Sequence, residues 1–260
     1  MMDQDLLITS AQNPRIKHLL ALQQKASLRR ELGLTVVEGR RELQHCLEAG
    51  GAVDTLYYCP DLCPVPPTAA TRVAVSREVY ARMAYRGGTE GVMALVRPRV
   101  LRLEDLVLGE NPLLVVLESV EKPGNLGAVL RSADAAAATA VVVCDPLTDL
   151  YNPNVVRGSI GAVFTVPCVA CDSASCIAFL RSHGIAILTA QLQDSAPYYD
   201  TPMTAGTALV MGTESTGLTQ VWRDAATAHI RIPMQGRLDS LNVSVSAAIL
   251  LFEAVRQRSV

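Results

Sequence analysis

Short, almost continuous apolar segments alternate with helical ones through the second half of the chain. They begin with "LLVVLESV" at Leu113 and continue with "AVVVC", "TVPCVA", "IAILTA" and "TALVMG". Such runs, rich in β-branched residues, are typical of strands buried on both faces, and the helices between them supply the crossovers that parallel strands need. The pattern therefore predicts a doubly wound α/β domain built on a parallel sheet.

The N-terminal part shows a weaker form of the same alternation. A helical pattern over 12–32 precedes a strand at 34–39, and further helices and strands follow up to the strand "GVMALV". The segment "RPRVLRLEDLVLGENP", which contains Pro98 and ends at Pro112, interrupts the alternation. We therefore predict two domains, 1–105 and 106–260, of which the first is a small α/β unit.

The composition excludes several classes of protein. Half of the 260 residues are hydrophobic, which allows a full core and excludes global disorder. The net charge of −2 gives no overall signal for nucleic acid, although almost all cations are arginine, which suits bidentate phosphate contacts. The apolar runs are too short to span a bilayer, and "MMDQDLLITS" lacks the basic start of an export signal. We expect a cytoplasmic protein without a membrane partner.

Seven cysteines, an odd number without a framework spacing, favour reduced thiols. Cys168 and Cys171 form a C-x-x-C that Cys176 follows, a pattern to be tested against zinc binding. The spacing falls on a predicted strand running into a helix, and no second pair with a suitable histidine follows. We therefore expect buried free thiols and no metal site.

Three glycine-containing loops fall where a parallel sheet places its ligands, at the carboxyl ends of strands. They read "EKPGNLGAVLR", "GTESTGL" and "PMQGRLDSLN". None has the G-x-G-x-x-G spacing of a dinucleotide site, and the chain contains no phosphate-binding loop of the G-x-x-x-x-G-K-S/T type. A Rossmann-type enzyme would also need an acidic ribose-binding residue, for which "VVVCDP" offers only Asp145.

Taken together, these loops resemble a known set of motifs. "KPGNLGAVLRSADA", "VMGTESTGL" and "IPMQGRLDSLNVSVSAA" are similar, in this order, to the three motifs of the SpoU (TrmH) family of RNA ribose 2′-O-methyltransferases in the SPOUT superfamily. "SAQNPRIKHLLAL" and "TVVEGRRELQHCLEAG" resemble an L30e-like substrate-binding domain. The resemblance implies a parallel-sheet SPOUT domain with a deep C-terminal trefoil knot, preceded by a small L30e-like α/β domain, and a homodimer that uses S-adenosylmethionine (AdoMet). Ser215 and Ala137 depart from the pattern, since glycine is common at both positions.

The resemblance also assigns roles to residues. It implies that backbone groups of Gly212, Ile232 and Leu241 hold AdoMet, with Met234 lining the pocket. Its catalytic set comprises Asn125, Arg131, Glu214, Ser240 and Asn242. A ribose hydroxyl is a poor nucleophile, and all four histidines lie outside the motifs. The family's matching arginine is proposed as general base, but guanidinium stays protonated in proteins, so we favour Arg131 as a phosphate clamp that stabilises the developing alkoxide.

Each of these residues could instead have an ordinary structural role. Arg131 lies in a predicted helix, where a solvated or ion-paired arginine is the usual case. Glu214 could pair with the dipole of the helix that follows it, and Ser240 and Asn242 could be helix caps. Candidate RNA contacts in the first domain, any of which could equally be a solvated charge, are Arg15, Lys17, Arg40 and Arg41.

We therefore predict an AdoMet-dependent RNA 2′-O-methyltransferase whose N-terminal domain presents structured RNA to the catalytic domain. Among RNAs, 23S-type ribosomal RNA is favoured over tRNA, because the separate L30e-like domain is typical of rRNA-directed members of the family. Two alternatives stay open. One is a tRNA 2′-O-methyltransferase, and the other is a non-catalytic RNA-binding or ribosome-assembly factor on the same fold.

Overall fold

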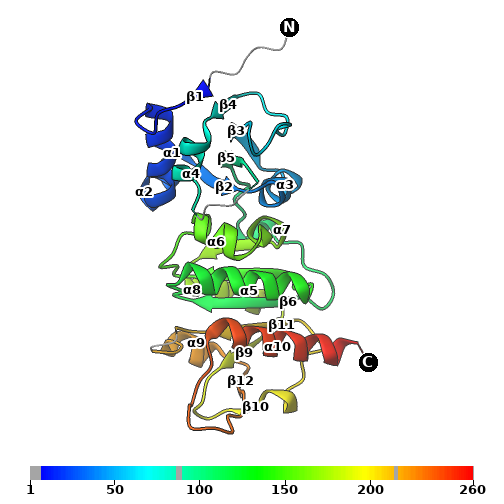
Figure 1. Ribbon diagram of the computed structural model, residues 1–260. Coiled ribbons are helices and arrows are strands. Elements are labelled where there is room, and N and C mark those ends of the chain that lie inside the picture. The colour runs from blue at the N-terminus through cyan, green and yellow to red at the C-terminus, as the bar shows by residue number, and fades with distance from the viewer. Residues whose placement is uncertain (1–6, 86–89, 214–215, 260) are drawn as a thin grey trace. The chain divides into compact units, whose positions relative to one another are not determined.

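The computed structural model describes residues 7–85, 90–213 and 216–259, which form two compact units (Figure 1). One unit combines the residues up to Arg99 with Tyr151–Thr165, and the other combines Val100–Leu150 with the residues from Val166 on. The units thus differ from the division at 105/106 in where residues 100–105 and Tyr151–Thr165 belong, and the domain boundary itself stays a prediction. No helix in the described ranges is long and apolar enough to cross a membrane.

The first unit contains a mixed five-stranded sheet in the order β1-β4-β3-β5-β2. Its strands are β1 (Leu7–Ile8), β2 (Thr35–Glu38), β3 (Ala52–Tyr58), β4 (Arg72–Val75) and β5 (Val92–Arg97). Its helices are α1 (Pro14–Gln24), α2 (Ala26–Leu32), α3 (Arg40–Glu48), α4 (Arg77–Met83), α6 (Pro153–Gly158) and α7 (Ala162–Thr165). The core of this unit packs the fully buried Ile16, Leu19 and Leu22 of α1 against the sheet.

The helix predicted over 12–32 is divided in the structure. Lys25 has an extended backbone, with φ −106° and ψ 105°, and separates α1 from α2. The buried guanidinium of Arg29 donates to the carbonyl oxygens of Leu22 (2.6 Å) and Gln23 (3.2 Å). These bonds satisfy carbonyls that the end of a helix leaves without an intrahelical donor, so the break costs little.

The second unit contains seven strands, all parallel, in the order β10-β12-β9-β11-β6-β7-β8. They are β6 (Leu113–Glu118), β7 (Ala140–Cys144), β8 (Cys168–Cys171), β9 (Ala186–Ala190), β10 (Ala196–Pro197), β11 (Thr207–Met211) and β12 (Ala228–Arg231). The parallel sheet predicted from the apolar runs is confirmed, and every residue of β6, β7 and β11 is buried. The trefoil knot stays a prediction.

Helices cover both faces of this sheet. They are α5 (Pro123–Ala135), α8 (Ser173–Ser182), α9 (Gln220–Ala225) and α10 (Val243–Arg258), with 3-10 turns at Leu103–Asp105 and Tyr198–Asp200. α8 and α9 pack on the face that contains Leu114 and Val116. Val115 and Leu117 point to the opposite face and are buried as well, and there α5 and α10 pack on β7 and β11 and against each other (Figure 1).

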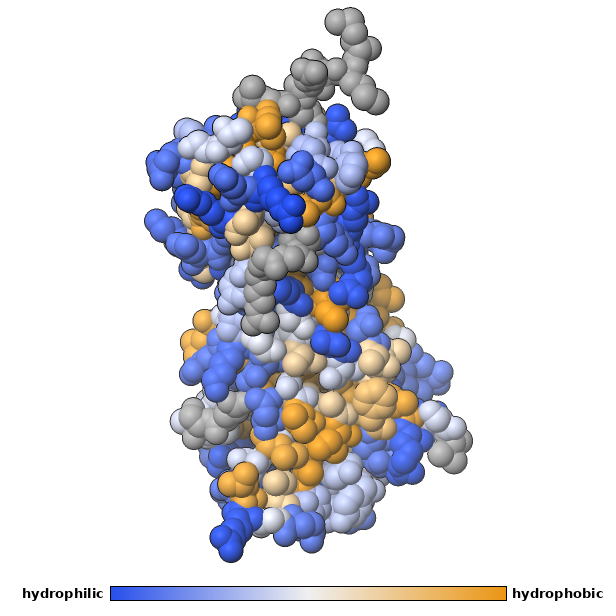
Figure 2. Space-filling model, viewed as in Figure 1, coloured by the Kyte–Doolittle hydropathy of each residue, from blue (hydrophilic) through white to orange (hydrophobic). Residues whose placement is uncertain are grey.

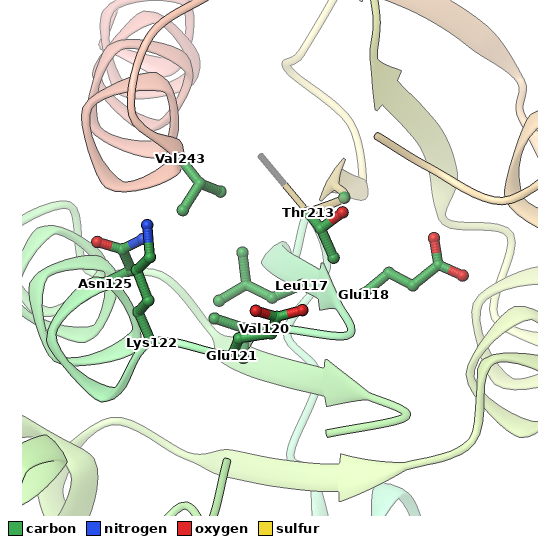
Figure 3. Close-up of a pocket in the computed structure, with 9 residues that line it drawn as sticks. Leu117, Glu118, Val120, Glu121, Lys122, Asn125, Thr213 and Val243 are labelled. Carbon is green, nitrogen blue, oxygen red and sulfur yellow. The ribbon is translucent and has the colours of Figure 1, made fainter. Parts of the chain in front are cut away.

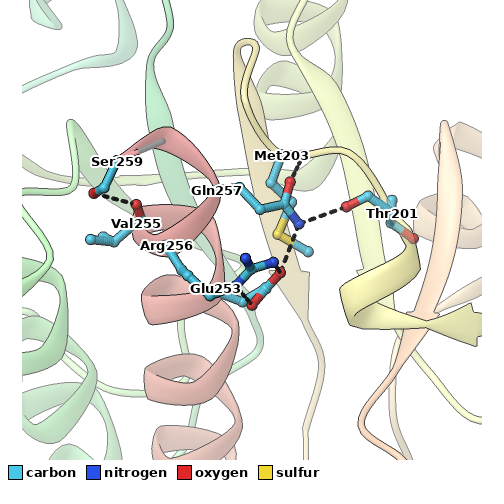
Figure 4. A network of polar contacts seen from close by, with 7 residues as sticks. All are labelled: Thr201, Met203, Glu253, Val255, Arg256, Gln257 and Ser259. Atoms are coloured by element: carbon cyan, nitrogen blue, oxygen red, sulfur yellow. Dashed lines mark hydrogen bonds and ion pairs between the residues drawn. The ribbon is translucent and has the colours of Figure 1, made fainter.

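The C-terminal end of α10 is held by a polar network (Figure 4). The side-chain amide of Gln257 donates to the carbonyl oxygen of Thr201 (3.1 Å) and to Glu253 (2.8 Å), and its oxygen accepts from the backbone N–H of Met203 (2.7 Å). The guanidinium of Arg258 donates to four nearby backbone carbonyls, including that of Met203 (2.8 Å). These contacts fix one end of α10, so that its other end is presented at the carboxyl edge of the sheet.

Ala137, where the family pattern favours glycine, adopts a left-handed backbone with φ 49° directly after α5. The N–H of Ala138 bonds the carbonyl of Ala133 (2.9 Å), as in a Schellman cap. We predict that Ala137→Gly raises the free energy of unfolding by about 0.5–1 kcal/mol, because glycine adopts this conformation without strain from a Cβ. Urea denaturation measures the change. Ala135→Gly, within the helix, should lower stability by a similar amount, and a loss of stability in Ala137→Gly would contradict the prediction.

Candidate functional site

A cavity of about 370 Å³ opens at the carboxyl ends of β9, β11 and β12. Its walls come from 190–193 after β9, 211–213 and 216–218 after β11, 230–234 around the end of β12, and the segment that leads into α10. The volume lies in the range of small-molecule sites, about 300–1,000 Å³. All four residues predicted to hold the cofactor line this cavity, namely Gly212, Ile232, Met234 and Leu241.

A smaller cavity of about 100 Å³ adjoins the first and shares Gly212, Thr213 and Val243 with it. Figure 3 shows Asn125 and Lys122 extending toward this space from the start of α5, and Val243 from the start of α10. The two cavities therefore form one recess at the edge of the sheet. Its larger part is lined by the predicted cofactor residues, and its smaller part by the predicted catalytic Asn125.

The loop after β11 is drawn tightly against itself. A Cβ on Gly212 would overlap the backbone of Gly217, so only glycine fits at this position. The hydroxyls of Thr213 and Thr216 lie 2.7 Å apart, and the N–H of Gly217 donates to the carbonyl of Thr213 (3.0 Å). Glu214, predicted to be catalytic, lies outside the described residues, as does Ser215.

The other side of this loop is fixed by a buried carboxylate. Glu118, at the end of β6, is only 4% exposed and accepts from both the backbone N–H (2.9 Å) and the hydroxyl (2.6 Å) of Thr219. Thr219 is the N-cap of α9, so this bond ties the start of α9 to the end of a central strand. In Figure 3 the Glu118 carboxylate points away from the other labelled side chains, which suits a structural role.

Asn125 and Asn242 are in contact, although 117 residues separate them. The Asn242 amide nitrogen donates to the side-chain oxygen of Asn125 (3.2 Å). The side-chain oxygen of Asn242 accepts from the N–H (2.9 Å) and the hydroxyl (2.6 Å) of Ser244, which makes Asn242 the N-cap of α10. Asn242 therefore caps α10 and also contacts Asn125, which lines the smaller cavity, and its catalytic role stays a prediction.

Ser240 and Arg131 differ in their placement. Ser240 lines the larger cavity and donates to Asp239 (3.3 Å). Arg131 is exposed on α5 and lines neither cavity, and among the described residues its guanidinium has no hydrogen-bond or ion-pair partner. Six residues along a helix amount to a rotation of about 240° and a rise of roughly 9 Å, which directs Arg131 away from Asn125. The chain by itself does not bring Arg131 to the recess.

The four candidate RNA contacts do not form one surface. Arg15 and Lys17 are exposed on the first turn of α1, whereas Arg40 and Arg41 begin α3, which lies on the other side of the unit (Figure 1). The guanidinium of Arg40 donates to the sulfur of Cys63 (2.8 Å) and the carbonyl of Val65 (2.7 Å), so it anchors a loop. Arg41 lies 3.5 Å from its neighbour Glu42.

Sequence reasoning missed several polar residues that line the larger cavity, among them Gln191, Arg223 and Arg231. The Nε of Arg223 and the side-chain oxygen of Gln191 are buried without a partner among the described residues. Such atoms in a cavity wall suit a polar ligand. Arg231 directly precedes the predicted Ile232, so its position next to a motif was the available signal; Arg223 and Gln191 lie in segments without one.

Comparisons with known proteins identify the family of this chain. The chain matches the SpoU rRNA Methylase family over residues 112–252 and an MRM3-like substrate binding domain over residues 13–94. It is 28% identical to the 23S rRNA (guanosine(2553)-2'-O)-methyltransferase RlmP of Bacillus subtilis, over 94% of this chain and 97% of that protein. It is 37% identical to the 23S rRNA (guanosine-2'-O-)-methyltransferase RlmB of Vibrio vulnificus, over 71% and 77%.

Among solved structures, an AdoMet-bound rRNA methyltransferase from Sinorhizobium meliloti superimposes with a TM-score of 0.88 at 31% identity, and the match covers 98% of each chain.

The cap at Asn242 makes a prediction about stability. Asn242→Ala should lower the free energy of unfolding by about 0.5–2 kcal/mol, because the N–H of Ser244 loses its acceptor. Asn242→Asp retains that acceptor and should cost less. Asn152→Ala is the matched control, since Asn152 caps α6 in the same way (2.9 Å to the N–H of Asn154) far along the chain from the recess. Urea denaturation of the three variants checks this, and unchanged stability in Asn242→Ala would contradict it.

Proposed function

The chain belongs to the SpoU rRNA methylase family, and from this premise we propose that it transfers a methyl group from AdoMet to the 2′-hydroxyl of a ribose in 23S-type ribosomal RNA. The observation that carries the proposal is the recess, where the four predicted cofactor residues adjoin the paired Asn125 and Asn242. The comparisons support the class of reaction, and both curated relatives named above are 23S rRNA guanosine 2′-O-methyltransferases by name.

The larger cavity fits AdoMet in size and in chemistry. Its walls combine apolar side chains, such as Met234 and Leu241, with the unpartnered polar atoms of Gln191 and Arg223. Gly212, Ile232 and Leu241 would hold the cofactor through backbone groups, and Met234 would line its apolar side. When bound, AdoMet supplies a methyl group that its sulfonium already activates.

The chain's own residues would position the ribose and stabilise charge. Asn125 and Asn242 fix each other, so a ribose bound beside them meets amide groups that are already oriented, with Ser240 nearby. Glu214 would contribute to the same positioning. Arg131 would hold an RNA phosphate and stabilise the alkoxide that develops as the hydroxyl loses its proton to solvent water. A guanidinium is suited to this electrostatic role because it stays charged.

A second copy of the chain would complete the site, and we propose that the protein is a homodimer. Arg131 faces away from the recess of its own chain, although α5 packs against α10. Along α10 and just before it, Leu241, Val245 and Phe252 are 36%, 46% and 48% exposed. Figure 2 shows an apolar area in the region of α10. An exposed apolar surface of this kind is typical of an interface between proteins, and pairing through it would bring Arg131 near the partner's recess.

Ribosomal RNA is the substrate that the chain as a whole supports best. The family model for the N-terminal part is a substrate-binding domain, and the match to the Bacillus subtilis relative runs through both domains. Arg15 and Lys17, which are exposed on α1, are the candidate phosphate contacts that remain available, while Arg40 and Arg41 would contribute less. A tRNA substrate remains the alternative. The cytoplasm is the proposed compartment, because it contains ribosomal RNA and keeps thiols reduced.

Methyl transfer from labelled AdoMet tests the function directly. The wild-type chain should label 23S ribosomal RNA and not tRNA, and Arg131→Ala should lower kcat about 100- to 1,000-fold, because it removes charge stabilisation needed mainly in the transition state. AdoMet affinity and Tm should stay unchanged. Arg181→Ala, an exposed arginine in the last turn of α8, is the matched control. Labelling of tRNA alone would overturn the rRNA assignment, and normal turnover of Arg131→Ala would remove this residue from the site.

The dimer makes a separate prediction. Phe252→Asp should convert the protein to a monomer at micromolar concentration, because it places a charge in an apolar interface. Sedimentation velocity measures the change, and methyl transfer should fall with it while AdoMet binding persists. Val107→Asp, at a residue that is 89% exposed elsewhere in the same unit, should leave the dimer intact. A wild-type protein that sediments as a monomer would contradict the proposal.

A further inference from the structure

Three cysteine thiols converge at the carboxyl ends of β7 and β8, the two strands at the opposite side of the sheet from β10 and β12. Cys144 is the last residue of β7, Cys171 the last residue of β8, and Cys176 lies in α8. The sulfur atoms of Cys144 and Cys171 are 4.0 Å apart, and all three sulfurs lie within 4.8 Å of one another. Cys168, which the sequence pattern grouped with Cys171, is not part of this cluster.

Strand geometry explains why Cys144, Cys171 and Cys176 lie together and Cys168 does not. Cys144 and Cys171 are paired in register on neighbouring parallel strands, so their side chains point to the same face of the sheet. α8 packs on that face and contributes Cys176. Cys168 precedes Cys171 by three residues on the same strand, and alternation directs its side chain to the opposite face. A C-x-x-C on a strand therefore cannot chelate one ion, whereas this trio can.

We propose that Cys144, Cys171 and Cys176 bind one thiophilic metal ion of the Zn²⁺ type. Tetrahedral zinc with Zn–S bonds of about 2.3 Å places its sulfur ligands about 3.8 Å apart. The 4.0 Å between Cys144 and Cys171 is close to that spacing, and small side-chain rotations would bring Cys176 to it. Water would fill the fourth position, since three protein ligands and a water are an established zinc arrangement.

The surroundings favour a cation and allow it to enter. Cys144 and Cys176 are fully buried, whereas Cys171 is half-buried and leaves a path from solvent. Asp145 and Asp172 directly follow two of the cysteines, and their carboxylates accept hydrogen bonds from Ser173 and Ser175. These two carboxylates are therefore held outside the ligand set, where their negative charge still attracts a cation.

A disulfide is the competing explanation. A Cys144–Cys171 bridge would require an S–S distance of about 2.05 Å, well short of the observed 4.0 Å. A bridge would also use only two sulfurs and leave the third thiol unexplained, whereas a metal uses all three. Because β8 is the edge strand of the sheet, the ion would join that strand and α8 to β7. Its effect should be on stability, since none of the three cysteines lines either cavity of the recess.

Metal binding to the reduced full-length protein tests the proposal. Incubation with Zn²⁺ followed by gel filtration should leave one zinc per chain by mass spectrometry and raise Tm by several degrees, because a ligand that binds only the folded state stabilises it. Co²⁺ in place of Zn²⁺ should give a thiolate-to-cobalt charge-transfer band. Cys171→Ser should abolish the bound zinc, the band and the Tm increase. Cys168→Ser is the matched control on the same strand and should retain all three.

Cys171 is half-buried, so its serine variant is expected to fold, and retained AdoMet binding verifies this. Equal zinc content in Cys171→Ser and wild type would overturn the proposal. So would wild-type protein that binds no zinc when reduced, or one whose intact mass shows the loss of two hydrogens through a disulfide within the trio.

Discussion

The parallel pairing of β9, β11 and β6 is the constraint on which the recess depends. Strands that run in one direction end at one edge, so the loops after β9, β11 and β12 open there and meet the start of α10. Each loop alone lines only part of the cavity. Their convergence creates a cavity that none of them could form separately, which is why residues as far apart as Asn125 and Asn242 are in contact.

The sequence was most informative where a local pattern determines the structure. Continuous apolar runs predicted the buried strands, and the three loops that resemble family motifs contained Gly212, Ile232, Met234 and Leu241, all of which line the cavity. The strands could be predicted because burial follows a pattern of residues close together in the chain, whereas the roles of the four residues in cofactor binding stay predictions.

Features that depend on distant residues were harder to predict. The break at Lys25 is compensated by Arg29, whose long side chain reaches back to α1. Arg40 was a candidate RNA contact, but its guanidinium donates to the sulfur of Cys63, a contact that the sequence does not reveal. The pairing of Cys144 with Cys171 follows from strand register, which the spacing of cysteines along the chain does not contain. In each case the decisive partner is brought close only by the fold.

The anchored end of α10 has a mechanical consequence. Gln257 and Arg258 bond backbone groups at 201–205, so α10 cannot slide along its axis without breaking several hydrogen bonds. The exposed segment 235–241 precedes the opposite end of the helix and has no comparable attachment to the sheet in the described part of the chain. The wall of the recess that this segment forms is therefore less constrained than the wall formed by α10, whose axial position is set at its far end.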